Sequence, residues 1–184
     1  RGSDYFYKLR EKNVDRTADA ELAAWRIYLN KTGFNGLYRV NSKDRFNVPF
    51  GRYAKPNICD AENLRACSAA LAGVAIVHGD FAQVVQGASR DDFVYFDPPY
   101  VPLSRTSDFT GYTSAGFGPD DQRRLRDTAR ALKTRGVRVL LSNSSAAGVR
   151  ELYGEGFTVA EVSALRSVNS KASGRGAVAE LVIT

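Results

Sequence analysis

The stretch Phe93-Val94-Tyr95-Phe96-Asp97-Pro98-Pro99-Tyr100 is the part of this chain that decides the fold prediction. Its first four residues are all apolar, and a short apolar run that ends abruptly is typical of a buried β-strand. The two consecutive prolines hold the backbone at fixed φ and cannot extend a sheet ladder. The sequence therefore predicts a rigid turn at a strand end, presenting a carboxylate, backbone carbonyls and an aromatic ring.

The groups presented by this turn match the amino group of a planar base. A carboxylate and a carbonyl can accept hydrogen bonds from the two amino hydrogens, which turns the nitrogen lone pair toward a methyl donor. The aromatic ring can stack on the base. The alternative interpretation is a proline-rich turn that only ends a strand, and a four-residue motif does not decide between the two.

The length and composition indicate one soluble domain with room for a small insertion. The chain has 184 residues, of which 43% are hydrophobic and 25% charged, and these are ordinary proportions for a globular protein. No apolar stretch approaches membrane-spanning length, and nothing resembles a signal peptide. Cys59 and Cys67 have no histidine cluster near them in the sequence. We therefore expect neither a metal site nor a disulfide framework, and a cytoplasmic protein.

The segment from Lys31 to Pro56 combines basic and aromatic residues. The formal net charge of the chain is +6, and this segment holds six Lys or Arg residues against one acid, together with five aromatic residues. Basic charge attracts phosphates, and interleaved rings can stack on bases or wedge between them. The alternative interpretation is a solvated loop whose rings pack on the core.

Predicted helices and strands alternate along the rest of the chain. We expect helices at residues 17–30, after Asp60, after Asp80, at residues 119–135 and at residues 146–153. We expect strands at residues 74–77, 93–96, 137–141, 157–162 and 177–183. This alternation predicts an α/β fold with a mainly parallel sheet.

Four blocks carry a resemblance to a known family. The first is Thr32-Gly-Phe-Asn-Gly-Leu-Tyr-Arg39 followed by Phe46-Asn-Val-Pro-Phe-Gly-Arg-Tyr53, and the second is Gly79-Asp80-Phe81. The third runs from Asp97 to Tyr112, and the fourth is Leu141-Ser-Asn143. In their order and spacing they resemble the Dam-type DNA adenine-N6 methyltransferases, which methylate adenine within GATC. The resemblance runs from about residue 5 to the C-terminus.

One part of the family pattern is absent from this sequence. Family members normally begin with a glycine-rich segment of the type F-x-G-x-G, which lines the pocket for S-adenosylmethionine, followed by an acidic residue that holds the ribose. The sequence instead opens at Arg1-Gly2-Ser3 and continues into material that resembles the middle of the family. Three interpretations stay open: a fragment, a protein whose N-terminal part is on another polypeptide, or an altered relative that binds the cofactor poorly.

The resemblance implies roles for the residues of the catalytic and cofactor sites. Asp97 and the carbonyl of Pro98 would hold the adenine amino group, Pro99 would complete the rigid turn, and Tyr100 would stack on an adenine that has left the duplex. Asp80 and Phe81 would hold the adenine of S-adenosylmethionine, and Asp97 would also lie near the amino-acid end of this cofactor. The competing interpretation is that Asp80 caps a helix and Phe81 belongs to the core.

The resemblance also implies a set of DNA contacts. Phe34 would fill the stack beside the extruded base, Arg39 would read a guanine, and Leu37 and Pro49 would contact a thymine methyl group. The alternative for Arg39 is a phosphate contact without sequence preference. Further expected contacts to bases or phosphates are Asn35, Asn47, Arg52, Tyr53, Ser104 and Thr106.

The implied fold is a Rossmann-like methyltransferase fold, with helices on both faces of the sheet and an inserted DNA-recognition subdomain. We expect a helical lead-in at residues 1–30, target recognition at residues 31–72 and the catalytic core at residues 73–184. The implied function is methyl transfer from S-adenosylmethionine to adenine N6 in double-stranded DNA. Two rivals are a DNA-binding remnant without activity and a methyltransferase that acts on RNA or a glutamine side chain. The basic aromatic segment argues against the last of these.

Overall fold

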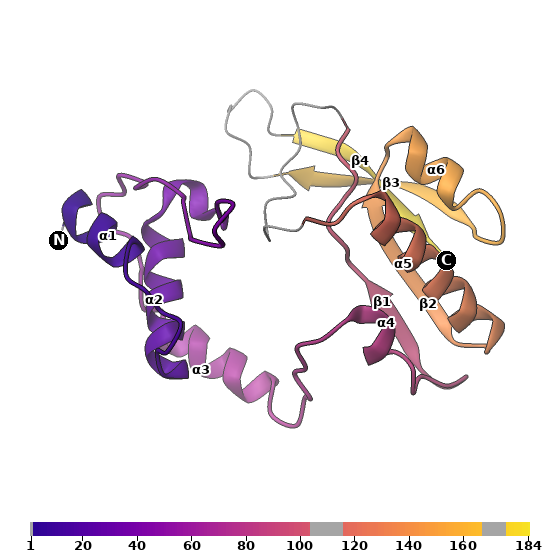
Figure 1. The fold of residues 1–184 in the computed structure, drawn as a ribbon, viewed down its shortest axis with the longest axis horizontal. Helices are drawn as coiled ribbons and strands as arrows, with labels where there is room; N and C mark the ends of the chain where they lie inside the picture. Colours follow the sequence, from indigo (N-terminus) through magenta and orange to yellow (C-terminus); the bar gives the residue numbers. More distant parts are fainter. Residues whose placement is uncertain (1, 104–115, 167–175) are drawn as a thin grey trace. The chain divides into compact units, whose positions relative to one another are not determined.

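A computed structural model describes residues 2–103, 116–166 and 176–184 (Figure 1). The described chain forms two compact units, which adjoin in the sequence between Ile76 and Val77. The first unit is helical, and the second contains a sheet with helices packed on it.

The first unit packs two helices and a folded loop around a small aromatic core. Its elements are α1 (Ser3–Arg10), α2 (Asp19–Thr32), the 3₁₀ turn η1 (Phe34–Gly36) and α3 (Ala61–Ala70). The core consists of the buried side chains of Phe6, Leu29, Phe46 and Val48. Helix α2 begins and ends two residues later than predicted. The predicted cap of α3 is confirmed, because Asp60 Oδ1 accepts a hydrogen bond from the Asn63 amide at 3.2 Å.

The second unit contains a four-stranded sheet with the strand order β1-β2-β4-β3. Strand β1 is joined to β2 through helix α5, and the two strands are parallel, so they form a β-α-β crossover. The bounds are α4 (Phe81–Val84), β1 (Phe93–Phe96), α5 (Pro119–Thr134), β2 (Arg138–Ser144), α6 (Ala147–Leu152), β3 (Val159–Arg166) and β4 (Gly176–Ile183). The predicted positions of these elements are confirmed to within a few residues.

The prediction of a mainly parallel sheet is wrong for the described strands. Only β1 and β2 are parallel, whereas β4 runs antiparallel to both β2 and β3. Strands β3 and β4 follow each other in the sequence and pair along their whole length, from Val159 with Ile183 to Arg166 with Gly176. Such a direct return of the chain is antiparallel, because a parallel return needs a crossover connection.

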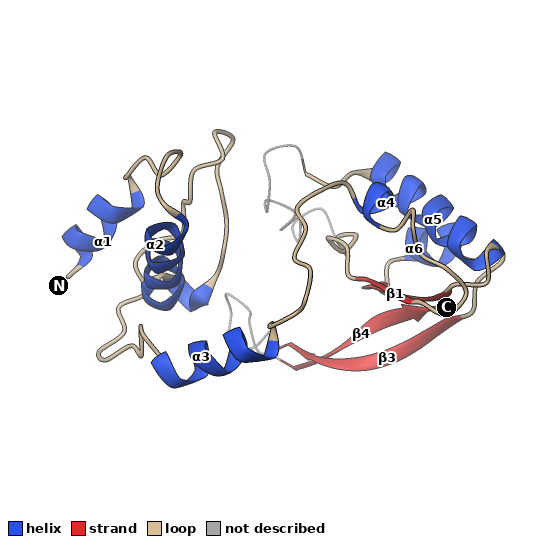
Figure 2. Ribbon diagram, turned by 90° about the horizontal axis from the view of Figure 1, so that it is seen from below, coloured by secondary structure: helices blue, strands red, loops and turns tan. Residues whose placement is uncertain are grey.

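The described helices of the second unit cover one face of the sheet, whereas we expected helices on both faces. Figure 2 shows α4, α5 and α6 on the same side of the strands. The side chains on that face, among them Phe96, Leu141 and Ile183, are buried in a core with Leu125 of α5 and Val149 of α6. On the opposite face Phe93 and Tyr95 are about half exposed, at 59% and 52%. The apolar run of β1 contains no polar alternation, so its sequence could not distinguish the two faces.

The predicted strand at residues 74–77 is not formed. This segment has no strand assignment and pairs with none of the described strands, and Val74, Ile76 and Val77 are exposed. An apolar run becomes a strand only when a neighbouring strand satisfies its backbone groups.

Two further properties concern the described ranges as a whole. No helix in them combines the length and the apolar character that crossing a bilayer requires. Nor do three or more His, Cys, Asp or Glu side chains in these ranges converge in a way that could hold a metal ion.

Candidate active site

The Asp97–Tyr100 segment lies beside the polar end of the neighbouring strand, and the predicted turn is not formed, because these four residues make neither a turn nor a bend. Phe96 pairs with Leu141 in the parallel register, so the segment leaves the sheet where β2 continues into Ser142-Asn143-Ser144. These three polar residues are buried. The carboxyl ends of parallel strands are the usual place for ligand sites in α/β folds. Buried polar residues there have to satisfy their hydrogen bonds locally, and the Asp97–Tyr100 segment and Val101 supply partners.

Asp97 is oriented by one hydroxyl group and remains exposed. The hydroxyl of Ser142 donates a hydrogen bond to Asp97 Oδ1 at 2.9 Å, and the same hydroxyl lies 3.0 Å from the Tyr95 hydroxyl. Asp97 itself is exposed, whereas Ser142 is buried. The Ser142 hydroxyl therefore fixes the orientation of the Asp97 carboxylate, while the remaining lone-pair positions of its oxygens stay accessible to an amino group.

Two buried amide side chains hold the backbone on both sides of Tyr100. Gln122 Nε2 of α5 donates to the Pro99 carbonyl at 2.9 Å, and Gln122 Oε1 accepts from Asn143 Nδ2 at 3.1 Å. Asn143 Oδ1 accepts from the amide of Val101 at 3.0 Å and from that of Ser144 at 2.9 Å. The Ser144 hydroxyl donates to the Val101 carbonyl at 2.6 Å. The peptide groups that flank Tyr100 are thus fixed by side chains from two other elements.

The side chain of Tyr100 is partly buried and uncharged at ordinary pH. Its hydroxyl donates a hydrogen bond to Glu180 Oε2 of β4 at 3.3 Å. Burial raises the pKa of Tyr100, and the neighbouring charges of Glu180 and Asp97 act in the same direction. A phenol held neutral in this way is suited to stacking and hydrogen bonding rather than to removing a proton.

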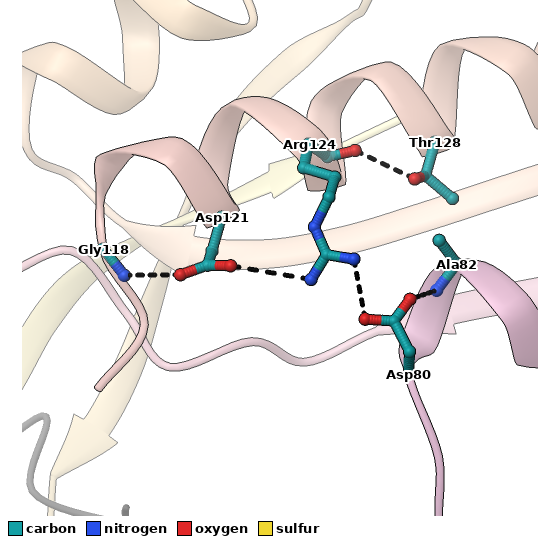
Figure 3. Close-up of polar contacts among 6 residues, drawn as sticks. All are labelled: Asp80, Ala82, Gly118, Asp121, Arg124 and Thr128. Carbon is teal, nitrogen blue, oxygen red and sulfur yellow. Dashed lines mark hydrogen bonds and ion pairs between the residues drawn. The ribbon is translucent and has the colours of Figure 1, made fainter. Parts of the chain in front are cut away.

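The second predicted site block forms the start of helix α4. Asp80 caps this helix, since its Oδ1 accepts from the Ala82 amide at 3.0 Å. Its Oδ2 accepts from Arg124 Nη1 of α5 at 2.6 Å, as Figure 3 shows. The hydrogen bond from Arg124 lowers the pKa of Asp80, so the side chain is a carboxylate at neutral pH. The capping role that we considered for Asp80 is therefore present, and the carboxylate is still one-third exposed.

Phe81, the first residue of α4, packs its ring against the end of strand β1. Its ring meets that of Phe96, the residue before Asp97, edge-on at a centroid distance of 6.4 Å. The ring of Phe117 lies 6.1 Å away, and the guanidinium carbon of Arg124 lies 4.4 Å above the Phe81 ring. Phe81 is packed against the core, as its alternative interpretation had it, but it is only partly buried.

In the first unit, the loop after α2 folds back on itself through backbone pairs. The amide of Phe34 donates to the Pro49 carbonyl at 2.8 Å, and Gly33 forms an antiparallel bridge with Phe50. Phe34 remains 39% exposed. Arg39 and Asn47 lie together, with Arg39 Nε donating to Asn47 Oδ1 at 2.7 Å and Nη2 to the Asn47 carbonyl at 3.3 Å.

The other predicted DNA contacts differ in their surroundings. Arg52 and Tyr53 are exposed. Asn35 and Arg52 have left-handed backbones, with φ of 54° and 52°. Leu37 packs partly against the core of the first unit. Ser104 and Thr106 lie outside the described residues.

Four residues of the site were not predicted from the sequence: Gln122, Arg124, Ser144 and Glu180. Gln122 had a readable signal, because it shares the helix spacing of Leu125, Ala129 and Leu132, all of which are buried. A polar residue on the buried face of a helix indicates an internal hydrogen bond. Asn143 belonged to a quoted block but had no assigned role. Nothing in the sequence pointed to the pair of Arg124 with Asp80.

Taken together, the second unit is an α/β unit whose polar groups gather at the carboxyl ends of two parallel strands, which is the arrangement of a ligand site. A family model described as D12 class N6 adenine-specific DNA methyltransferase matches residues 1–168. This chain belongs to that family.

Individual relatives agree with the family. The chain is 45% identical to a type II methyltransferase of Lactococcus lactis subsp. cremoris, with 98% of this chain and 66% of the relative covered. It is also 45% identical to a type II methyltransferase of Methanocaldococcus jannaschii, with 94% and 61% covered. A DNA adenine methylase of Haemophilus influenzae is 36% identical, with 97% and 62% covered. The chain thus spans slightly less than two-thirds of the length of these relatives.

Proposed function

We propose that this chain carries the target-base site of a DNA adenine-N6 methyltransferase, which uses S-adenosylmethionine and acts on adenine in double-stranded DNA, within GATC. The observation that carries the proposal is the Asp97–Tyr100 segment, held by buried side chains of β2 and α5 in a chain of this family. The segment offers an oriented carboxylate, a backbone fixed by side chains and a neutral aromatic ring in one place. These are the groups that hold and stack an amino-substituted base.

The residues of the Asp97–Tyr100 segment would act mainly by positioning. Asp97 and the Pro98 carbonyl accept the two amino hydrogens of adenine, which directs the nitrogen lone pair away from the protein. Tyr100 stacks on the extruded ring. S-adenosylmethionine, when bound, supplies a methyl group on a sulfonium that leaves as a thioether, and the amino nitrogen loses one proton once the new bond has formed. Orientation and electrostatics would therefore supply most of the rate.

The cofactor's adenine would be held by Asp80 and Phe81. An ionised, one-third exposed carboxylate suits the exocyclic amino group of an adenosyl moiety, and the partly buried ring of Phe81 offers an apolar contact. Asp97 would approach the amino-acid end. These three residues fit an adenosyl ligand chemically.

DNA would be read by the loop of the first unit. Two of the guanidinium donors of Arg39 are engaged by Asn47, and the fork has further N–H groups for the O6 and N7 acceptors of a guanine. Exposed Phe34 would fill the stack beside the extruded adenine. Leu37 and Pro49 would contact a thymine methyl group, and Asn35, Asn47, Arg52, Tyr53, Ser104 and Thr106 would contact bases or phosphates.

The domain assignment belongs to the same proposal. We take residues 31–72 as a recognition subdomain inserted into a Rossmann-like methyltransferase fold, with residues 1–30 as its lead-in and residues 73–184 as catalytic core. The β1-α5-β2 crossover supports a Rossmann-like element in the second unit. A glycine-rich cofactor segment, carried on the same or another polypeptide, would complete the cofactor pocket.

The testing experiment is transfer of labelled methyl from S-adenosylmethionine to matched duplexes with and without GATC. We expect incorporation that depends on GATC and is lost in the Asp97→Ala variant. Incorporation that is equal on both duplexes would refute the proposed sequence preference. Binding to GATC duplexes without incorporation would favour a fragment that lacks the glycine-rich cofactor segment or a DNA-binding remnant.

A further inference from the structure

Arg124 touches both residues that we propose for the cofactor's adenine. Its Nη1 donates to Asp80 Oδ2 at 2.6 Å (Figure 3). Its guanidinium carbon lies over the Phe81 ring, 4.4 Å from the ring centroid. Its Nη2 lies 3.5 Å from Asp121 Oδ1 in the first turn of α5. One side chain therefore bridges the start of α4 and the start of α5.

Each end of this bridge is anchored by the backbone. Asp80 Oδ1 accepts from the Ala82 amide, and Asp121 Oδ2 accepts from the Gly118 amide, both at 3.0 Å. With Oδ1 tied to Ala82 and Oδ2 tied to Arg124, the Asp80 carboxylate has one defined plane. Each oxygen keeps a second lone-pair position for an incoming donor.

Stability alone is a weak reason for this arrangement. The side chains of Arg124 and Asp80 are 47% and 33% exposed, and ion pairs this exposed contribute little to folding. The same helix carries a second, more exposed arginine–aspartate pair, Arg123 with Asp120, that touches neither Asp80 nor Phe81 in any described contact. The two pairs differ in what the arginine contacts, and this difference makes Arg123 a matched control.

We propose that Arg124 is a positioning residue that orients the Asp80 carboxylate and the Phe81 ring to select an adenine ring over a 6-oxopurine ring in the cofactor site. The inference rests on the proposed function, because it takes Asp80 and Phe81 as contacts of the adenosyl group. A fixed carboxylate accepts a hydrogen bond from the 6-amino group of adenine. It repels the carbonyl oxygen that hypoxanthine carries at the same position, because neither group has a hydrogen to donate.

The test measures binding of two ligands that differ at this one position, S-adenosylhomocysteine and S-inosylhomocysteine. Dissociation constants would be determined by ligand-observed NMR at up to millimolar ligand, for the full chain and for Arg124→Ala, Arg124→Lys and Arg123→Ala. This readout needs no turnover. Lysine keeps the charge but cannot bridge two carboxylates and cover a ring with one planar group.

We expect the unsubstituted chain to prefer the adenosyl ligand. Arg124→Ala should weaken adenosyl binding by roughly 3- to 10-fold, the range for loss of one hydrogen-bonding contact. The preference of this variant for the adenosyl over the inosyl ligand should fall by a similar factor. Arg124→Lys should be intermediate and Arg123→Ala unchanged. Where methyl transfer is measurable, the KM for S-adenosylmethionine should rise in Arg124→Ala while kcat stays the same.

Two results would overturn the inference, and they are distinguishable. If the unsubstituted chain binds both ligands equally, the assignment of Asp80 to the adenosyl group fails, and the role of Arg124 fails with it. If it prefers the adenosyl ligand and Arg124→Ala keeps that preference, or Arg123→Ala loses as much, then only the positioning role is refuted.

Discussion

Replacing Gln122 by leucine tests whether the buried amide pair holds the segment that carries Tyr100. The substitution keeps a side chain of similar size and removes both polar atoms. The Pro99 carbonyl then loses its donor, and Asn143 Nδ2 loses its acceptor. The Gln122 side chain hydrogen-bonds both to the segment and to β2, so its removal should loosen the segment as well as lower stability.

The size of the stability loss follows from how deeply the two groups that lose a partner, Asn143 Nδ2 and the Pro99 carbonyl, are buried. Asn143 is fully buried, so water cannot replace its acceptor, and an unpaired group of this kind costs about 1–3 kcal/mol. Pro99 is only partly buried, so its carbonyl can recover water, and the net loss there is about 0.5–1.5 kcal/mol. Burial of the leucine returns about 1 kcal/mol. We expect the free energy of unfolding to fall by about 1–3 kcal/mol.

The assay is urea unfolding followed by far-UV circular dichroism, together with hydrogen exchange of the Val101 amide, which Asn143 binds. Gln86→Leu, at an exposed position, is the control for the chemistry of the substitution. A double-mutant cycle combines Gln122→Leu with Asn143→Leu. In the double variant both side-chain amides are absent, so neither is left buried without the partner it has in the unsubstituted chain. The two losses should therefore be non-additive by about 1–2 kcal/mol. Additive losses together with unchanged exchange of Val101 would refute the reasoning.

Three further outcomes are expected. Asp97→Ala should abolish methyl transfer and leave DNA affinity within a few-fold, and retained turnover would exclude Asp97 as the essential acceptor. Arg39→Ala should cost about 1–3 kcal/mol in binding to cognate duplex only, measured by anisotropy; an equal loss on unrelated DNA would make Arg39 a phosphate contact. Tyr153→Phe should stabilise the fold by about 1 kcal/mol in urea unfolding, because the Tyr153 hydroxyl is buried without a hydrogen-bond partner in the described structure. Burial raises the pKa of Tyr153, so stability of the unsubstituted chain should fall as pH rises above about 10, and the phenylalanine variant should lack this component.

The local elements of the chain could be predicted because their signals are local. Pro119, the acids that follow it and Gly136 mark the two ends of α5, and Asp60 and Asp80 cap their helices as their positions suggested. The arrangement of the strands in the sheet was harder to predict. The sequence of an apolar strand does not show whether its neighbour runs parallel or antiparallel, and the direction of β4 depends on its pairing with β3.

The site was predicted only in the residues that adjoin a motif. Asp97 and Tyr100 follow from the motif itself, whereas the side chains that hold them come from residues more than twenty positions away. Ser142, for example, meets Asp97 from 45 residues further along the chain. Such contacts depend on the register of β1 against β2, which the sequence of either strand does not specify.

Strand β1 has a neighbour on one side only in the sheet of the described residues. The run Phe93–Phe96 has high β-propensity, no charge and no proline, and at a sheet edge such a run can recruit a strand from another molecule. Charges bracket it, with Arg90, Asp91 and Asp92 before it and Asp97 after it. Flanking charges of this kind oppose aggregation. Asp97→Ala removes one of the charges that flank the run, so an inactive Asp97 variant has to be shown monodisperse before its inactivity is attributed to catalysis.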